Sequence, residues 1–294
     1  MQQRPLTGLD VAIIGGDRRE VVLAEEFIKK GAKVWLYGFA QYKLPINKLI
    51  KQGIPAGADI IILPLPGVLN DHSIYSAYAA EKIYFTELNP LLQADVLLFC
   101  GRIPEHLRQS LQEQGIRLII TSQLEELAVI NAVPTAEGVL EIALRESQIT
   151  LNHSSVLITG FGSCAQQLAR VTAALGAEVT IAARKRKDLA TAAVLGYKAV
   201  TFDKLAEQMA DINFIFNTVP ALVLTKDILA KAQKNVLIYD IASAPGGTDF
   251  AAARALGLQA ALLPGLPGKV APLTVGRQLA EIYAYYISLH KRRE

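Results

Sequence analysis

The sequence GFGSCA carries the residue types and the spacing of a phosphate-binding loop. Gly160, Gly162 and Ala165 fit the pattern G-x-G-x-x-G/A, between a short apolar run and a segment of helical periodicity. The first glycine permits a tight turn, the second lets a pyrophosphate approach the backbone, and the alanine lets the helix pack closely on the strand. Ser163 and Cys164 then lie in the first turn of a helix whose free N–H groups attract anions. We expect these five residues to bind a dinucleotide.

Four cationic residues, Arg184, Lys185, Arg186 and Lys187, follow the next apolar run. In units that bind NAD, an Asp or Glu at this point holds the 2′-hydroxyl of the ribose, whereas positive charge suits the 2′-phosphate of NADP. We therefore expect Arg184 and Lys185 to bind this phosphate, and Arg186 and Lys187 to face water. NAD remains the alternative cofactor, because a run of like charges is often simply a solvated surface.

Two further loops follow predicted strands of the same half. Ligands of open α/β sheets bind beyond the carboxyl ends of the strands, so these loops should meet at the glycine loop. The loop residues expected to contact the cofactor are Asn217, Thr218, Val219, Pro220, Ile241, Ala242 and Ser243.

The dinucleotide segment belongs to a repeated unit. Residues 11–39 align without a gap on residues 156–184, and each copy runs from an apolar stretch through a glycine-containing loop and a helical segment to a second apolar stretch. Gly31 and Gly176 are placed to end the two helices. Later apolar runs recur in the same order, so each half reads β-α-β-α-β. The sequence predicts an α/β protein with two doubly wound, parallel-sheet (Rossmann-like) domains and a cleft between them.

The predicted domains are residues 1–130 and a nucleotide-binding domain of residues 131–272. A connecting helix is expected to begin at Pro134, because proline suits the first turn of a helix, and to run to about Ser147. An amphipathic C-terminal helix, residues 273–294, is expected to cross back onto the first domain and complete it.

The first copy differs from the second at one decisive position. Asp17 aligns with Gly162, and a carboxylate there would repel a pyrophosphate and occupy its space. We expect this copy to keep the fold without the nucleotide. Its GGDRR loop then forms either one wall of a substrate cleft or a plain surface turn.

The composition excludes several classes of protein. Of 294 residues, 51% are hydrophobic and 19% charged, and the net charge of +3 gives no strong field for a nucleic acid or an anionic membrane. The N-terminus has no apolar signal core, and we find no apolar stretch of the roughly 18 residues that span a bilayer. A cytoplasmic protein follows. Cys100 and Cys164 are expected to be buried thiols, and no residue cluster has the spacing of a metal site.

Longer motifs make the chain resemble the dipicolinate synthase A-subunit family of spore-forming bacteria. They occur in family order over nearly the whole chain, and they are LTGLDVAIIGGDRR, NAVPTAEG, NTVPA, DIASAPGGTDF and LPGLPGKVAPLTVG. The resemblance implies NAD(P)-dependent oxidation of dihydrodipicolinate to dipicolinate (pyridine-2,6-dicarboxylate) during sporulation. It also implies a partner, the flavoprotein-like B subunit of dipicolinate synthase. Ser163 departs from NADP-binding relatives, which often have an arginine there, so the 2′-phosphate would depend on Arg184 and its neighbour.

The implied substrate carries two carboxylates, which call for cations or N–H donors. Arg18 and Arg102 follow strands of the first domain and are candidates, although each could be an exposed loop arginine. Thr135 and Glu137 are candidates at the start of the connecting helix, where Glu137 could instead complement the helix dipole. The four histidines are expected at the surface, and no catalytic acid or base is identified.

Two other functions remain open. The chain could be a nucleotide-binding scaffold that needs its partner for activity. It could also be a different two-domain NADP-dependent dehydrogenase, of the shikimate or alanine dehydrogenase kind, because fold alone does not define the substrate. A homo-oligomer is also left open.

Overall fold

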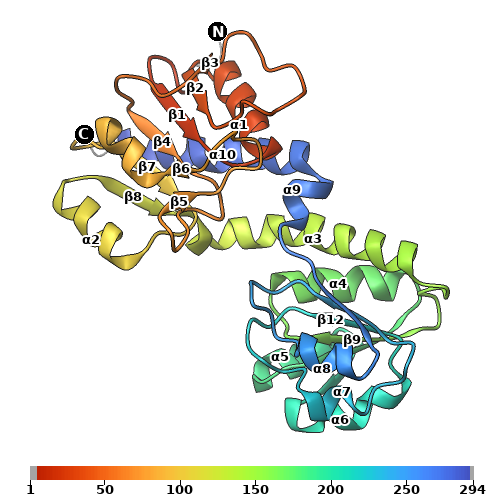
Figure 1. The fold of residues 1–294 in the computed structure, drawn as a ribbon. Coiled ribbons are helices and arrows are strands. Elements are labelled where there is room, and N and C mark those ends of the chain that lie inside the picture. Colours follow the sequence, from red (N-terminus) through yellow and green to blue (C-terminus); the bar gives the residue numbers. More distant parts are fainter. Residues whose placement is uncertain (1–4, 292–294) are drawn as a thin grey trace. The chain divides into compact units, whose positions relative to one another are not determined.

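The computed structural model describes residues 5–291 (Figure 1). Contacts divide the chain into two compact units. Unit 1 comprises residues 1–127 together with 271–294, and unit 2 comprises residues 128–270.

Unit 1 is built around a six-stranded parallel sheet with the strand order β3-β2-β1-β4-β7-β8. The strands are β1 (Asp10–Ile14), β2 (Lys33–Tyr37), β3 (Lys51–Gln52), β4 (Ile60–Ile62), β7 (Leu97–Cys100) and β8 (Arg117–Ile120). A short antiparallel pair, β5 (Ser73–Ile74) and β6 (Ile83–Tyr84), is inserted after β4. The helices are α1 (Arg18–Lys29), α2 (Glu105–Glu113) and α10 (Pro272–Lys291), with 3₁₀ turns η1 (Phe85–Leu91) and η2 (Thr121–Gln123).

Unit 2 repeats this plan with the strand order β11-β10-β9-β12-β13-β14. The strands are β9 (Ser155–Thr159), β10 (Glu178–Ala182), β11 (Lys198–Val200), β12 (Phe214–Asn217), β13 (Leu237–Asp240) and β14 (Gln259–Leu262). The helices are α4 (Ser163–Ala174), α5 (Arg186–Val194), α6 (Leu205–Gln208), α7 (Lys226–Leu229), α8 (Phe250–Ala255) and α9 (Leu266–Val270), with 3₁₀ turns η3 (Phe202–Lys204) and η4 (Met209–Asp211).

Both sheets therefore have the 3-2-1-4-5-6 order of dinucleotide-binding folds, and the predicted fold class is confirmed. The central strands β1, β4, β9 and β12 are apolar except at their ends, because helices cover both faces of such a sheet. Gly31 and Gly176 adopt φ values of +96° and +86° just after α1 and α4, which suits glycine.

The connecting helix differs from the prediction. Helix α3 spans Glu125–Glu146 and has Pro134 in its interior, so the expected start at Pro134 was wrong. Two glutamates in its first turn, Glu125 and Glu126, complement the helix dipole there. The proline lacks an N–H group, which costs one helical hydrogen bond but does not end the helix. Next to the proline, the Thr135 hydroxyl donates a hydrogen bond to the Asn131 carbonyl one turn earlier in α3 (2.7 Å).

Helix α3 also corrects the expectation about apolar length. Over the described residues, it is the single helix long and apolar enough to cross a membrane by length and composition. Half of its most apolar window is buried inside the protein. Ala136, Val139, Leu140 and Ala143 belong to the core of unit 2, so packing accounts for the apolar character of this part of the helix.

The C-terminal helix α10 packs on α1 within unit 1. A Cβ atom at Gly276 would lie 2.6 Å from Cβ of Val22 and 2.7 Å from the Arg19 carbonyl oxygen. The two helices therefore approach closely where α10 has no side chain. Tyr283, further along α10, stacks on Phe99 of β7 with ring centroids 4.6 Å apart.

We predict that Gly276→Ala destabilises unit 1, because the added methyl group must displace the backbone of α1. Overpacking of this kind costs about 1–3 kcal/mol, which exceeds the helix propensity gained by alanine. Thermal unfolding should show a lower midpoint temperature for the transition of unit 1. Gly57→Ala, at an exposed glycine with no atom within 4 Å of the added Cβ, should leave the curve unchanged. An equal effect of both substitutions would contradict this close packing.

Candidate cofactor site

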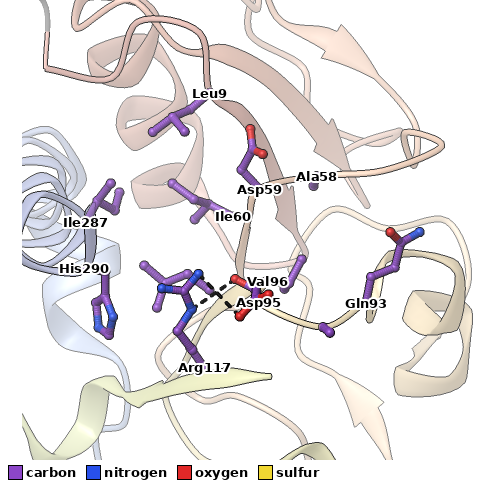
Figure 2. Close-up of a pocket in the computed structure, with 12 residues that line it drawn as sticks. Leu9, Ala58, Asp59, Ile60, Gln93, Asp95, Val96, Arg117, Ile287 and His290 are labelled. Atoms are coloured by element: carbon purple, nitrogen blue, oxygen red, sulfur yellow. Dashed lines mark hydrogen bonds and ion pairs between the residues drawn. The ribbon is translucent and has the colours of Figure 1, made fainter. Parts of the chain in front are cut away.

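One pocket of unit 1, shown in Figure 2, lies at the edge of the sheet opposite to that expected for a cofactor. Its volume is about 340 Å³, and it is lined by residues at the amino ends of β4, β7 and β8. The Arg117 side chain donates to the Asp95 carbonyl oxygen (3.2 Å) within it. Ligands of parallel sheets bind at the carboxyl ends of the strands, so the candidate cofactor site lies elsewhere.

The glycine loop of unit 2 connects β9 to α4. Gly160 has a φ of +88°, and a Cβ atom there would lie 2.5 Å from Oγ1 of Thr218 and 3.1 Å from Cγ2 of Val219. Its N–H donates to the Ala182 carbonyl of β10 (2.8 Å). The loop is therefore fixed between two neighbouring strands, and this position requires glycine.

The helix that follows begins without a side-chain cap. Gly162 is the N-cap residue of α4, and a Cβ atom there would meet no atom within 4 Å. The first N–H groups of a helix have no partner within the helix, so the amide groups at this uncapped end are available to an anion. Ala165 is fully buried in the core of unit 2 and lets α4 lie close to the sheet. The Gln166 side chain donates to the Phe161 carbonyl (2.9 Å) and braces the loop. A pyrophosphate fits this end of α4.

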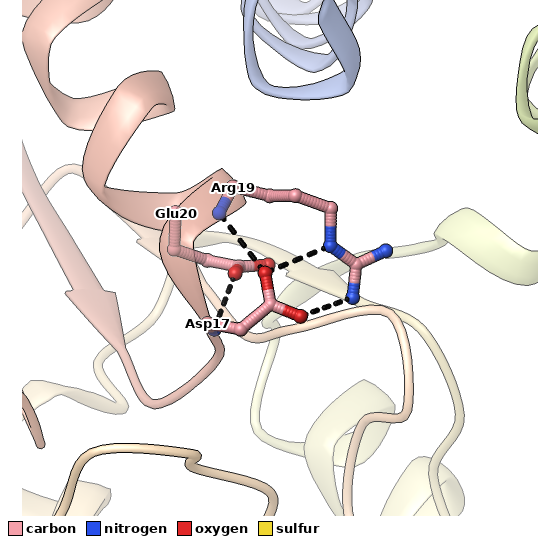
Figure 3. Close-up of polar contacts among 3 residues, drawn as sticks. All are labelled: Asp17, Arg19 and Glu20. Atoms are coloured by element: carbon pink, nitrogen blue, oxygen red, sulfur yellow. Dashed lines mark hydrogen bonds and ion pairs between the residues drawn. The ribbon is translucent and has the colours of Figure 1, made fainter. Parts of the chain in front are cut away.

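The equivalent end of α1 in unit 1 is closed by the protein itself (Figure 3). The Asp17 carboxylate accepts from the backbone N–H of Arg19 (2.9 Å) and from its guanidinium at Nε and Nη2 (2.9 Å each). The Glu20 carboxylate accepts from the Asp17 N–H (2.7 Å), which completes a capping box. The Gly16 N–H donates to the Tyr75 carbonyl (2.8 Å). The anion site of this copy is therefore occupied by two carboxylates and a carbonyl group.

This capping group is buried. Arg19 is 5% exposed and Glu20 2% exposed. Burial raises the pKa of Glu20 to about 7, and the Arg19 charge opposes that rise. Asp17 and Arg19 place opposite charges side by side, so the Arg19 guanidinium is already paired and is not available to a phosphate.

Two loops from neighbouring strands lie beside the glycine loop of unit 2. Asn217 at the end of β12 pairs in register with Thr159 of β9 and with Asp240 of β13. Asn217 has no exposed surface, so its side chain lies behind the loop rather than on its open face. The remaining predicted residues of these loops are Thr218, Val219 and Ile241, which are half-buried, Pro220 and Ser243, which are exposed, and Ala242, which is buried.

The four cationic residues lie at the end of β10, where they were expected. Arg184 and Lys185 form the turn between β10 and α5, and Arg186 and Lys187 begin α5. All four are exposed, so exposure does not separate the two predicted pairs. Lys185 is the N-cap residue of α5 and gives it no side-chain hydrogen bond. A phosphate at this turn would meet both the cations and the positive end of α5.

The predicted roles of Thr135 and Glu137 at a helix start are wrong, because both lie inside α3. Thr135 is buried, and its hydroxyl is engaged with the Asn131 carbonyl and the Cys164 thiol. Glu137 is exposed in the middle of the helix. Cys164 is half-buried, so the expectation of a fully buried thiol was wrong for this cysteine. Burial raises the pKa of its thiol, which therefore stays protonated at neutral pH.

Arg18 and Arg102 both lie at the carboxyl edge of the unit 1 sheet. Arg18 is the first residue of α1 and hydrogen-bonds the Tyr42 hydroxyl. Arg102 is exposed just after β7, and its carbonyl accepts from the Val68 N–H (2.8 Å). Each keeps its guanidinium at the edge where ligands of such sheets bind.

Sequence reasoning assigned no role to three residues that hold this site together: Thr159, Gln166 and Asp240. Each is polar at the end of a buried strand or in the first turn of a helix, and that position is the signal that could have found them. Asp240 is fully buried, yet it accepts from Ala242 N–H (3.1 Å), Gly247 N–H (2.8 Å) and Thr248 Oγ1 (2.8 Å). These donors compensate the buried carboxylate.

Two family models match consecutive parts of the chain. Residues 10–121 match the N-terminal domain of the A subunit of dipicolinate synthase. Residues 142–238 match the NAD binding domain of the D-isomer specific 2-hydroxyacid dehydrogenases. The second match includes the glycine loop, the cationic turn and the end of β12, so this part of the chain is a nicotinamide-dinucleotide-binding domain of the dehydrogenase type.

Similar proteins cover nearly the whole chain. The A subunit of dipicolinate synthase from Bacillus subtilis (strain 168) is 32% identical over 282 residues, which cover 94% of this chain and 95% of that protein. The crystal structure of the A subunit of dipicolinate synthase from Bacillus halodurans matches with a TM-score of 0.88 and 33% identity, over 96% of this chain and 98% of that one. That of the A chain of dipicolinate synthase from Bacillus subtilis matches with a TM-score of 0.87 and 31% identity, over 98% and 99%.

We predict that Gly162→Asp abolishes dinucleotide binding in a protein that stays folded. The new side chain has open space and could cap α4 as Asp17 caps α1, so the melting temperature should stay level or rise. The carboxylate would then repel the pyrophosphate. Isothermal titration calorimetry with NADP and NAD measures the loss.

Gly57→Asp is the matched control, because it adds the same charge at an open, exposed glycine of unit 1. It should bind as the wild type does. Unchanged affinity of a folded Gly162→Asp protein would disprove the assignment of the pyrophosphate to α4.

Proposed function

Because this chain belongs to the dipicolinate synthase A-subunit family, we propose that it oxidises dihydrodipicolinate to dipicolinate with NADP as the hydride acceptor. The family and the nicotinamide-dinucleotide-binding domain are the premises of this proposal. The substrate, the direction of the reaction, the choice of NADP and a role in sporulation belong to the proposal itself.

The uncapped start of α4 is the observation that carries the proposal. Gly160 and Gly162 keep side chains away from it, and Gln166 holds the loop between them in place. The bound dinucleotide would supply a hydride acceptor, which no side chain can replace. The protein would hold the phosphates of the dinucleotide at α4 and place the nicotinamide ring at the loops after β12 and β13. The dihydropyridine ring loses one hydride and one proton in the reaction, and the aromatic ring of the product provides driving force.

The preference for NADP rests on the turn after β10. The turn offers Arg184, Lys185 and the uncapped end of α5 to a 2′-phosphate. Within residues 5–291, none of these cations forms a salt bridge with a carboxylate, and the position has no acidic residue to hold a free ribose hydroxyl.

The two substrate carboxylates are proposed to bind Arg18 and Arg102. A planar guanidinium matches a carboxylate with two parallel hydrogen bonds. Neither arginine is paired with an acidic side chain within the described part of the chain.

A second candidate function is a nucleotide-binding scaffold that works only with the flavoprotein-like B subunit of the synthase. One observation favours it: His153, the single histidine of unit 2, lies in a turn before β9, at the edge opposite to the cofactor loops. A proton acceptor from the partner would then complete the site. In either case we propose a cytoplasmic protein.

Reconstitution distinguishes the two functions. The purified chain is mixed with dihydrodipicolinate precursor and NADP, with and without the partner, and the absorbance of pyridine-2,6-dicarboxylate is followed. We expect product and an equal amount of NADPH. Product formed by the chain alone would exclude the scaffold function. Product formed in the presence of the partner without any NADPH would exclude the dehydrogenase function.

We predict that Arg184→Ala weakens NADP binding by about ten- to a hundredfold and leaves NAD binding nearly unchanged. A charge-assisted hydrogen bond to a phosphate is worth about 1.5–3 kcal/mol, which corresponds to that factor. Lys185→Ala should act in the same direction but more weakly, because an ammonium group is better hydrated. Binding is measured by fluorescence titration at low and high salt.

Lys187→Ala is the control, since this residue is expected to face water. Higher salt should narrow the difference between the two cofactors, because an exposed contact is screened. Equal wild-type affinity for NAD and NADP at low salt would show that the cationic turn is simply a solvated surface.

A further inference from the structure

Three buried polar side chains form a row across the carboxyl edge of the unit 2 sheet. They are Thr159, Asn217 and Asp240, at the ends of three adjacent strands, and each is 0% exposed. The Thr159 hydroxyl donates to Oδ1 of Asn217. The row lies directly beneath the three loops that are expected to meet the dinucleotide.

The Asn217 side-chain amide hydrogen-bonds the backbone of the loop that follows it. Its Nδ2 donates to the Val219 carbonyl (3.0 Å), and its Oδ1 accepts from the Val219 N–H (3.1 Å). Both peptide groups of Val219 are therefore fixed by one side chain. The Val219 side chain in turn packs against Gly160, where a Cβ atom would be 3.1 Å from it.

The same amide connects the loop to the one after β13. A Cβ atom at Gly247 would lie 2.8 Å from Nδ2 of Asn217, so these two groups are in close contact. The Gly247 N–H donates to Asp240, and its carbonyl accepts from the N–H groups of Val223 and Leu224 (2.9 Å each). The two loops are thus held as one piece through Asn217 and Asp240.

From this geometry we propose that Asn217 is a positioning residue for the nicotinamide half of the cofactor and makes no contact with it. The inference rests on the proposed function, because it assumes that the loop at Val219 borders the reactive half of a dinucleotide. The adenosine half depends instead on the turn after β10. The side-chain hydrogen bonds of Asn217 go to Thr159 of β9 and to its own loop, and none of them reaches that turn. The two halves of the cofactor should therefore respond differently to a change at this residue.

The test uses Asn217→Asp, which keeps the shape of the side chain and replaces the Nδ2 donor by an oxygen. That oxygen would face the Val219 carbonyl without a hydrogen between them, so the loop must shift. We expect the Kd for NADP to rise about tenfold and kcat to fall by at least as much. The Kd for adenosine 2′,5′-bisphosphate, the adenosine half of NADP, should stay within about twofold of the wild type. Calorimetry measures both affinities on the full chain.

Asn213→Asp is the matched control, because Asn213 also bonds a backbone group, the Ser155 N–H (2.9 Å), but at the amino side of the same strand. It should leave both affinities unchanged. Thr159→Val gives a second approach if Asn217→Asp does not fold: it removes the hydroxyl that steadies Asn217, and Thr159→Ser should restore NADP binding.

Parallel loss of affinity for the cofactor and for its adenosine half would overturn the inference, since it would mean a general disturbance of unit 2. Unchanged binding and kcat in a folded Asn217→Asp protein would overturn it as well. A wild-type chain that binds the adenosine fragment but gives no NADPH with precursor and partner would instead defeat the proposed function.

Discussion

The hydrogen-bonding requirement at a helix N-terminus controls how the two halves of this molecule differ. Each half begins with a strand, a tight glycine turn and a helix whose first N–H groups need acceptors. In unit 1 the acceptors are the carboxylates of Asp17 and Glu20, and the helix is complete without a ligand. In unit 2 the N-cap is Gly162, and the acceptors must come from water or from a bound anion. One fold thus yields a closed copy and an open copy.

The surroundings of each glycine turn follow from this difference. In unit 1 the backbone around Tyr75 lies on the turn, hydrogen-bonds Gly16 and closes it. In unit 2 the loops after β12 and β13 are held by the buried row of Thr159, Asn217 and Asp240 at the ends of their strands. A buried amide or carboxylate is stable only when its hydrogen bonds are satisfied, so these loops have little freedom to collapse onto the open site.

The sequence was sufficient to predict the strands, the two sheets and the glycine loop, because buried parallel strands and a G-x-G-x-x-A turn leave local signals. The start of α3 could not be read from Pro134, since a helix can continue through a proline when neighbouring hydrogen bonds compensate for the one it loses. The position of Asn217 behind its loop was equally hidden. A polar residue at a strand end can face a ligand or support the loop, and only the contacts across three strands separate these cases.

Of the N-termini of α1 and α4, only that of α4 is open to a dinucleotide. The proposed cofactor site and the proposed reaction both depend on this difference. The most direct measurement is the stoichiometry of NADP binding to the wild-type chain by isothermal titration calorimetry. The bound site is identified in the same samples by protection of the β9–α4 loop or the β1–α1 loop from hydrogen exchange. We expect one nucleotide per chain and protection at Gly160 to Ala165. Two nucleotides per chain, or protection at the turn before α1, would contradict the assignment of a single dinucleotide site to the start of α4.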